Sequence, residues 1–162
     1  MDAFSVRTKI MIGGGMDALA QRLHRVFLVT DKFMAESGKT NYVTDRLLRN
    51  GGEFKIFSDV QADPDIATVT RGVEQILEFQ PDAVVAFGGG SPMDCAKAML
   101  EFGKKLGAGA DIRFVAVPTT AGTGSEVTSF AVLTDRAKGV KYPLVDDALL
   151  PDEAILDPSL LA

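Results

Sequence analysis

The chain has little of the chemistry on which several protein classes depend. Its 162 residues include one cysteine and one histidine, Cys95 and His24. A single cysteine excludes an internal disulfide and fits a reducing compartment, and a single histidine excludes a histidine-rich metal site. A net charge of −5 argues against nucleic acid or an anionic membrane surface as a partner. No apolar run is as long as a membrane span, and residues 1–9 lack the apolar core of a secretory signal.

Apolar strand-like runs alternate with helical patterns along most of the chain. The runs lie at 26–30, 54–58, 83–87 and 114–117, with helical spacing of apolar residues within 16–23, 40–50, 63–77 and 91–103. This alternation predicts an α/β fold with a Rossmann-like, mostly parallel sheet and helices on both faces. Residues 129–134 and 140–145 flank a turn near Lys138 and Gly139, which predicts a C-terminal antiparallel hairpin.

The most informative segment is a glycine turn, Gly88–Gly90, directly after the third strand-like run. Glycines reach backbone angles closed to other residues and leave no side chain in the way of a ligand. Ser91 suits a helix N-cap, Pro92 suits the first helical position, and Asp94 completes an S-x-x-D capping box. The turn then offers backbone N–H groups at the positive end of a helix to a phosphate or pyrophosphate. The alternative is a tight strand–helix turn without a ligand.

Three further candidates accompany the glycine turn. Asp31 ends a strand, where it could accept hydrogen bonds from a ribose diol and repel a 2′-phosphate, which favours NAD over NADP; the alternative is an N-cap for a helix over 32–36. The hydroxyl-rich stretch 118–128 could contact a polar ligand or form a solvated loop. Lys141 could contact a diphosphate or a hydroxyl, or be an exposed strand lysine.

Other features are interpreted as structural. The glycines at 13–15 precede a helix, but residues 9–12 are a poor strand, so a dinucleotide loop there is not favoured. His24 is expected at an exposed helix end. Cys95 is expected to pack within its helix rather than act as a nucleophile.

Several of these segments together resemble the N-terminal half of an iron-dependent (group III) alcohol dehydrogenase. The segments that carry the resemblance are 88–97, 118–128, 138–142, 151 and 155–158. Residues 139–144 look most like the propanol and ethanol dehydrogenases of bacterial microcompartments. The resemblance implies one dehydroquinate synthase-like, NAD-binding domain over 1–162, with the family's helical metal and substrate domain outside this chain. The implied NAD contacts are Asp31, Gly88, Gly89, Gly90, Ser91, Asp94, Thr119, Thr120, Thr128 and Lys141.

The resemblance also implies an activity, hydride transfer between NAD(H) and short primary alcohols or aldehydes, with a divalent metal, iron or zinc, in the full-length enzyme. The family's metal ligands follow this region, so neither a metal ligand nor a catalytic residue is assigned, and the chain alone is expected to be inactive. Two alternatives stay open: a non-catalytic nucleotide-binding module with exposed apolar residues such as Ile155, and a polyol dehydrogenase or dehydroquinate synthase-like branch. We expect a cytoplasmic homo-oligomer, with a bacterial microcompartment as the alternative location.

Overall fold

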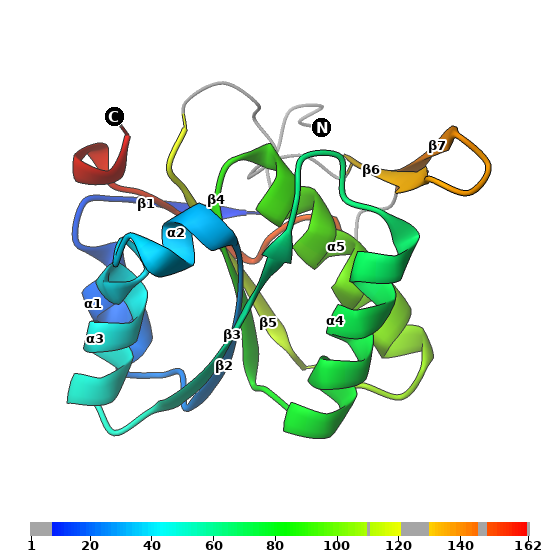
Figure 1. Cartoon of the computed structure of the whole chain (residues 1–162). Coiled ribbons are helices and arrows are strands. Elements are labelled where there is room, and N and C mark those ends of the chain that lie inside the picture. Colours follow the sequence, from blue (N-terminus) through cyan, green and yellow to red (C-terminus); the bar gives the residue numbers. More distant parts are fainter. Residues whose placement is uncertain (1–7, 110, 121–129, 146–148, 162) are drawn as a thin grey trace, which may run out of the picture.

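A six-stranded parallel sheet forms the centre of the molecule (Figure 1). The computed structural model describes residues 8–109, 111–120, 130–145 and 149–161. In spatial order the strands are β1 (Lys9–Ile12), β8 (Glu153–Leu156), β5 (Arg113–Pro118), β4 (Ala83–Gly88), β2 (Arg25–Asp31) and β3 (Glu53–Val60). The four strands predicted from the sequence are confirmed, each slightly longer than expected.

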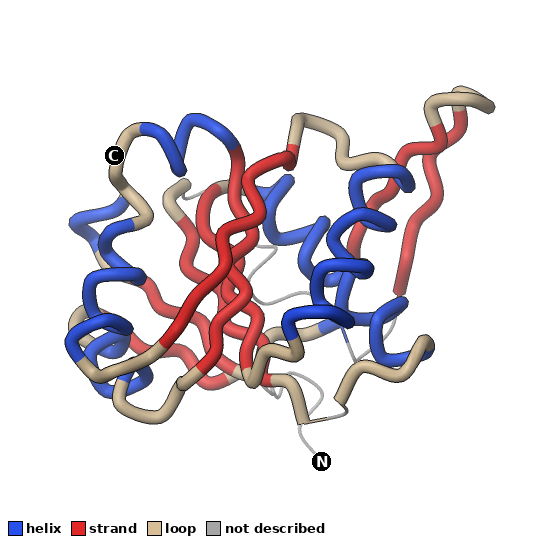
Figure 2. Tube along the Cα trace, turned by 60° about the horizontal axis from the view of Figure 1, so that its bottom comes forward, coloured by secondary structure: helices blue, strands red, loops and turns tan. Residues whose placement is uncertain are grey.

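Helices cover both faces of the sheet, as predicted (Figure 2). One face carries α1 (Gly15–Ala20), α2 (Lys32–Glu36) and α3 (Asn41–Arg49), and the other carries α4 (Ile66–Phe79) and α5 (Gly90–Lys105). Strand β2 contributes side chains to the hydrophobic core on each face of the sheet. Val26 and Leu28 pack with α1 and α3, while Phe27 and Val29 pack with α4 and α5. In the part of the chain that the structure describes, no helix is long and apolar enough to cross a membrane.

The pairing of β1 with β8 corrects two expectations. Residues 9–12 do form a strand, and Ile155 is fully buried within β8, which lies between β1 and β5. Strand β1 escaped prediction because it is a short edge strand with mostly exposed side chains, so its sequence has no buried alternation. Because Ile155 is buried, it does not form the apolar surface on which the binding-module alternative depended.

Strand β8 begins with a buried carboxylate. Glu153 is 1% exposed, and its side chain pairs with Arg113 and, at 3.4 Å, with Nη2 of Arg22. Two guanidinium groups compensate the buried charge at the amino edge of the sheet. Beyond β8, a short 3₁₀ helix, η3 (Pro158–Leu160), is held near α3, where the Tyr42 hydroxyl donates to Asp157 Oδ2 at 2.8 Å.

The predicted hairpin is confirmed as β6 (Phe130–Asp135) and β7 (Val140–Val145), which pair antiparallel. Gly139 has a φ of +66°, a conformation that favours glycine in the tight connection. Thr134 N donates to Pro64 O at 3.0 Å, and Arg136 Nε lies 2.9 Å from Asp65 Oδ2. These contacts attach the hairpin to the loop between β3 and α4, on the α5 side of the sheet (Figure 1).

Candidate functional site

The glycine turn lies where β4 and β5 end together. Gly88 aligns with Pro118 across the two strands, and Thr119 N donates to Gly88 O at 2.9 Å. Gly88 has a φ of +136°, and a Cβ atom there would lie 3.0 Å from Pro92 Cγ. Both the backbone conformation and the close approach of Pro92 therefore require glycine at this position.

Helix α5 begins without a side-chain cap, which corrects the prediction for Ser91. The N-cap is Gly89, and Ser91 lies in the first turn of a helix that starts at Gly90. The predicted capping box with Asp94 is therefore wrong, because the extended residue Gly89 is the cap and the helix begins two residues earlier than a cap at Ser91 would place it. Because Pro92 has no N–H, the first-turn donors come from the glycines and Ser91, at the positive end of a sixteen-residue helix.

Side chains from two other strand ends surround the turn. A Cβ atom on Gly88 would lie 3.8 Å from Asp31 Oδ2, and one on Gly89 would lie 3.5 Å from Thr120 Oγ1. The Thr30 hydroxyl donates to Phe87 O at 2.8 Å and so ties the end of β2 to the end of β4. The ends of β2, β4 and β5 thus bring an acid, a glycine turn and a hydroxyl to one edge of the sheet.

Thr119 contributes a buried hydroxyl to the same edge. The residue is 6% exposed, and its Oγ1 has no hydrogen-bond partner among the described residues. A buried hydroxyl without a partner is costly, so it marks a position where a polar ligand atom would be favourable.

Asp31 caps helix α2, which is the structural alternative that the sequence left open. Its Oδ1 accepts a hydrogen bond of 2.8 Å from Met34 N, so the residue is the N-cap of α2. The cap uses one carboxylate oxygen, and the other lies beside Gly88. A single carboxylate can therefore start α2 and still face the glycine turn.

Not every predicted contact residue joins this cluster. Lys141 lies on β7 with its Nζ 3.9 Å from Asp63 Oδ1, and both side chains are 65% exposed, which fits the exposed strand lysine. Asp94 lies one turn inside α5. Thr128 lies outside the described residues.

The remaining titratable candidates are structural. Cys95 is buried in α5, and burial raises the pKa of its thiol to about 12, so it stays protonated and packs as expected. His24 is exposed, in the connection before β2 rather than at a helix end. Among the described residues, no three His, Cys, Asp or Glu side chains cluster so as to hold a metal ion. The metal site that the resemblance implies is thus not found among the described residues.

Known proteins resemble this chain in sequence and in fold. The family model described as "Iron-containing alcohol dehydrogenase" matches residues 8–158. The 1-propanol dehydrogenase PduQ of Citrobacter freundii is 43% identical over 163 aligned residues, which cover 99% of this chain and 44% of that protein. The chain thus spans less than half the length of this curated relative.

Two solved structures have the same fold. An iron-containing alcohol dehydrogenase from Thermococcus thioreducens has a TM-score of 0.86 at 28% identity, covering 97% of this chain and 47% of that one. The sulfoacetaldehyde reductase of Bifidobacterium kashiwanohense, solved in complex with NAD⁺, has a TM-score of 0.81 at 34% identity, covering 99% of this chain and 47% of that one.

Proposed function

The chain belongs to the iron-containing alcohol dehydrogenase family, and we propose that residues 1–162 form its NAD-binding domain. The observation that carries the proposal is the uncapped start of α5. The N-cap is Gly89, so the cap residue has no side chain to bond the first-turn N–H groups, and Gly88 cannot be replaced without strain. This combination suits a pyrophosphate, which accepts hydrogen bonds from backbone N–H groups and has no need of side chains.

The residues around the turn fit the rest of a dinucleotide. Gly89, Gly90 and Ser91 would donate backbone hydrogen bonds to the pyrophosphate, and the free oxygen of Asp31 would accept from an adenosine ribose hydroxyl. The Thr119 hydroxyl, which has no partner among the described residues, would gain one on the cofactor. When bound, NAD(H) supplies the hydride acceptor or donor. Thr120, which lies beside Gly89, belongs to the same proposed set. Asp94, Thr128 and Lys141 stay predicted contacts that do not lie in the described cluster.

For the whole protein we propose oxidation of short primary alcohols and reduction of the corresponding aldehydes, because the relatives named above are alcohol dehydrogenases and an aldehyde reductase. A polyol dehydrogenase or a dehydroquinate synthase-like lyase is the alternative. The metal, iron or zinc, would belong to the part of the enzyme outside this chain. We further propose a cytoplasmic homo-oligomer, with a bacterial microcompartment as the alternative location.

Calorimetric titration of the 162-residue chain with NADH, ADP-ribose and NADPH tests the cofactor proposal. We expect NADH and ADP-ribose to bind one per chain and to compete, because both contain the pyrophosphate and the adenosine ribose. NADPH should bind more weakly, because its 2′-phosphate would approach the Asp31 carboxylate. Absence of NADH binding by a chain with a cooperative unfolding transition would refute the site.

A further inference from the structure

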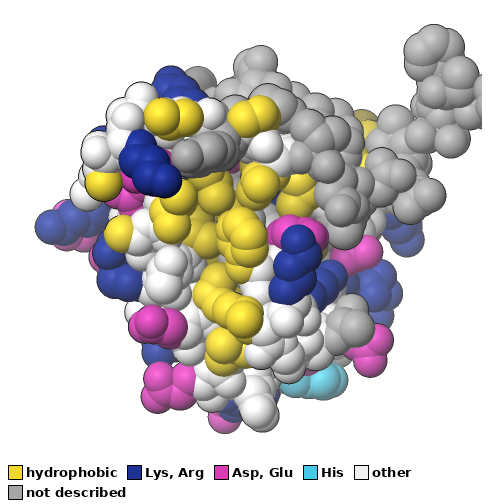
Figure 3. Space-filling view, turned by 90° about the vertical axis from the view of Figure 1, so that its right-hand side faces the viewer, with side chains coloured by type: hydrophobic (Ala, Val, Ile, Leu, Met, Phe, Trp, Pro, Cys, Tyr) yellow, Lys and Arg dark blue, Asp and Glu magenta, His cyan; other side chains and the backbone are white. Residues whose placement is uncertain are grey.

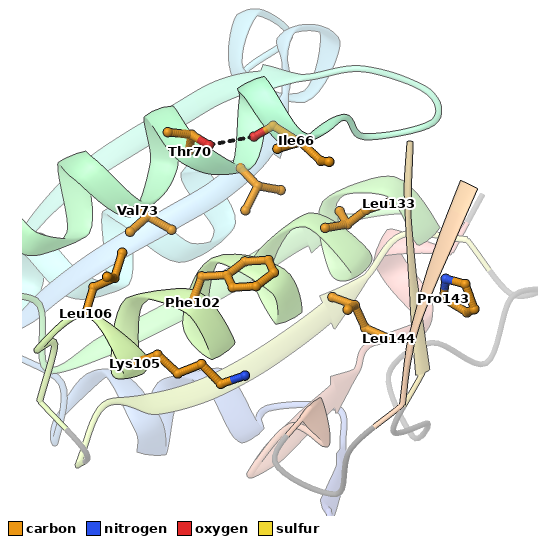
Figure 4. Close-up of a pocket in the computed structure, with 10 residues that line it drawn as sticks. Ile66, Thr70, Val73, Phe102, Lys105, Leu106, Leu133, Pro143 and Leu144 are labelled. Carbon is orange, nitrogen blue, oxygen red and sulfur yellow. Dashed lines mark hydrogen bonds between the residues drawn. The ribbon is translucent and has the colours of Figure 1, made fainter. Parts of the chain in front are cut away.

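An apolar groove runs between α4, α5 and the β6–β7 hairpin, away from the glycine turn. It has a volume of about 680 Å³, within the range of small-molecule sites. Figure 3 shows hydrophobic side chains gathered along this face. In Figure 4 the ring of Phe102 lies between the side chains of α4 and Leu144 of the hairpin. None of the residues proposed to bind NAD lines the groove.

The floor of the groove is already formed. Val69, Val73 and Leu133 are each at least nine-tenths buried and belong to the core under α4 and α5. The spacing of the two helices is fixed where Met99 fills the space beside Gly72, since a Cβ atom on Gly72 would lie 2.2 Å from Met99 Cε. An occupant would therefore meet a shaped apolar surface without first opening the core.

The polar side chains that line the groove are few, a hydroxyl and an ammonium group. The Thr70 hydroxyl already donates to Ile66 O at 2.8 Å, so its proton is not available to a ligand carboxylate. Among the described lining residues the charged one is Lys105, at the border of the groove (Figure 4). Its side chain is 67% exposed, and its Nζ lies 3.1 Å from Oε1 of Glu101, whose side chain is 16% exposed. The remaining N–H groups of the ammonium could donate to a ligand carboxylate.

We propose that this groove binds an amphipathic monoanion, a straight-chain alkyl carboxylate, with the alkyl chain against Val73 and Phe102 and the carboxylate at Lys105. The interior satisfies no polar group, so the part of the ligand that enters must be apolar. The cation at the border complements an anionic end and disfavours a cationic one. The site is independent of the proposed NAD site because the two share no lining residue.

The test is calorimetric titration of the 162-residue chain with decanoate, 1-decanol and decyltrimethylammonium, each below its micelle concentration. We expect decanoate to bind one per chain, most tightly of the three. Lys105→Met should weaken decanoate binding about threefold and leave decanol unchanged, while Glu101→Gln should strengthen decanoate binding by releasing Lys105. Thr70→Trp should abolish binding by filling the groove. Glu74→Trp, at an exposed position of the same helix outside the lining, is the matched control.

Three results would overturn the proposal. Equal affinity for the three amphiphiles, or decanoate binding that survives Thr70→Trp, would show non-specific association. Sedimentation that shows a dimer dissociated by Thr70→Trp but not by Glu74→Trp would assign the groove to a second copy of the chain. An unchanged NADH affinity and unfolding midpoint in each variant confirms that the fold is intact, so loss of decanoate binding cannot come from misfolding.

Discussion

Two neighbouring strand–helix units differ in how the helix begins. After β3, Asp65 is extended and its Oδ1 accepts a 2.8 Å hydrogen bond from Thr68 N, which caps α4 within the chain. After β4, Gly89 holds the equivalent place and provides no side-chain acceptor for α5. The first unit bonds one of its first-turn N–H groups with a side chain of its own, whereas the N-cap of the second has no side chain to do so.

The comparison separates stability from binding. A capping aspartate contributes about 1 kcal/mol to stability, and glycine at the same position gives up only part of that. This stabilisation is absent at α5. Near its start lie the buried Thr119 hydroxyl, which has no partner among the described residues, and a carboxylate oxygen of Asp31 beside Gly88. The difference between the two helix starts is the basis of the proposed pyrophosphate site. If the proposal holds, variants at the start of α5 should lose NADH affinity, and variants at the start of α4 should lose stability.

The largest effect is expected from Gly89→Val. The backbone angles of Gly89, φ −90° and ψ −154°, are open to valine, and a Cβ atom would meet Thr120 at an ordinary 3.5 Å. The chain should therefore fold, but the branched side chain would occupy the space in front of the α5 N–H groups. We expect NADH affinity to fall about a hundredfold, the loss of one or two charge-assisted hydrogen bonds. Titration of Gly14→Val, at the N-cap of α1, is the control, and an unchanged affinity in Gly89→Val would reject the pyrophosphate site.

Asp31→Gly should have the next largest effect, on selectivity. Glycine replaces a capping aspartate at a cost of only a few tenths of a kcal/mol, so α2 should persist. Removing the carboxylate should raise the affinity for NADPH relative to NADH about tenfold, because the like-charge repulsion of the 2′-phosphate is lost. Parallel titrations with both cofactors measure the ratio. If the ratio is the same as in the parent chain, Asp31 is only the cap of α2.

Thr119→Val should lower the affinity for NADH without lowering the free energy of unfolding. Valine matches the shape of threonine and removes a buried hydroxyl that has no partner among the described residues, so the free energy of unfolding should stay level or rise. NADH affinity should fall about fivefold if the cofactor is that partner. Thr30→Val is the matched control, since its hydroxyl is bonded to Phe87 O and its loss should lower stability. A fall in stability without a fall in affinity would contradict the assignment of Thr119.

Asp65→Ala should have the opposite effect to Thr119→Val. The free energy of unfolding measured in urea should fall by about 1 kcal/mol, and the NADH affinity should be unchanged. Hydrogen bonds from Thr68 and the guanidinium of Arg136 lower the pKa of the Asp65 carboxyl from its ordinary 3.8. A lowered folded-state pKa means that this stabilisation is complete above the unfolded value and is lost as pH falls through the folded one. The difference in free energy of unfolding between the parent chain and Asp65→Ala should thus be constant near neutral pH and become smaller below about pH 4. A gap that widens on acidification would contradict the assigned role.

The sequence predicted the central strands of the sheet more reliably than its edge strand and the polar contacts at the strand ends. The buried runs of β2, β4 and β5 are visible because each is apolar throughout, as central parallel strands must be. Strand β1 is short and mostly exposed, and β8 begins with Glu153, whose burial depends on arginines distant in sequence. The glycine turn and Asp31 could be predicted as neighbours because parallel strands end at one edge, whereas the missing partner of Thr119 requires coordinates.

Ser91 is a second case in which the sequence did not predict the local structure. Its replacement is expected to have the smallest effect on stability. Its residue type and the Asp94 that follows predict a cap, yet the flexible glycines let α5 begin at Gly90, where Ser91 is an ordinary first-turn residue. Ser91→Ala should therefore change the free energy of unfolding by less than about 0.5 kcal/mol, well under the loss in Asp65→Ala. Urea unfolding of the two variants side by side measures the difference. Equal losses would mean that Ser91 caps α5 in solution, and the contrast between the two helix starts would then disappear.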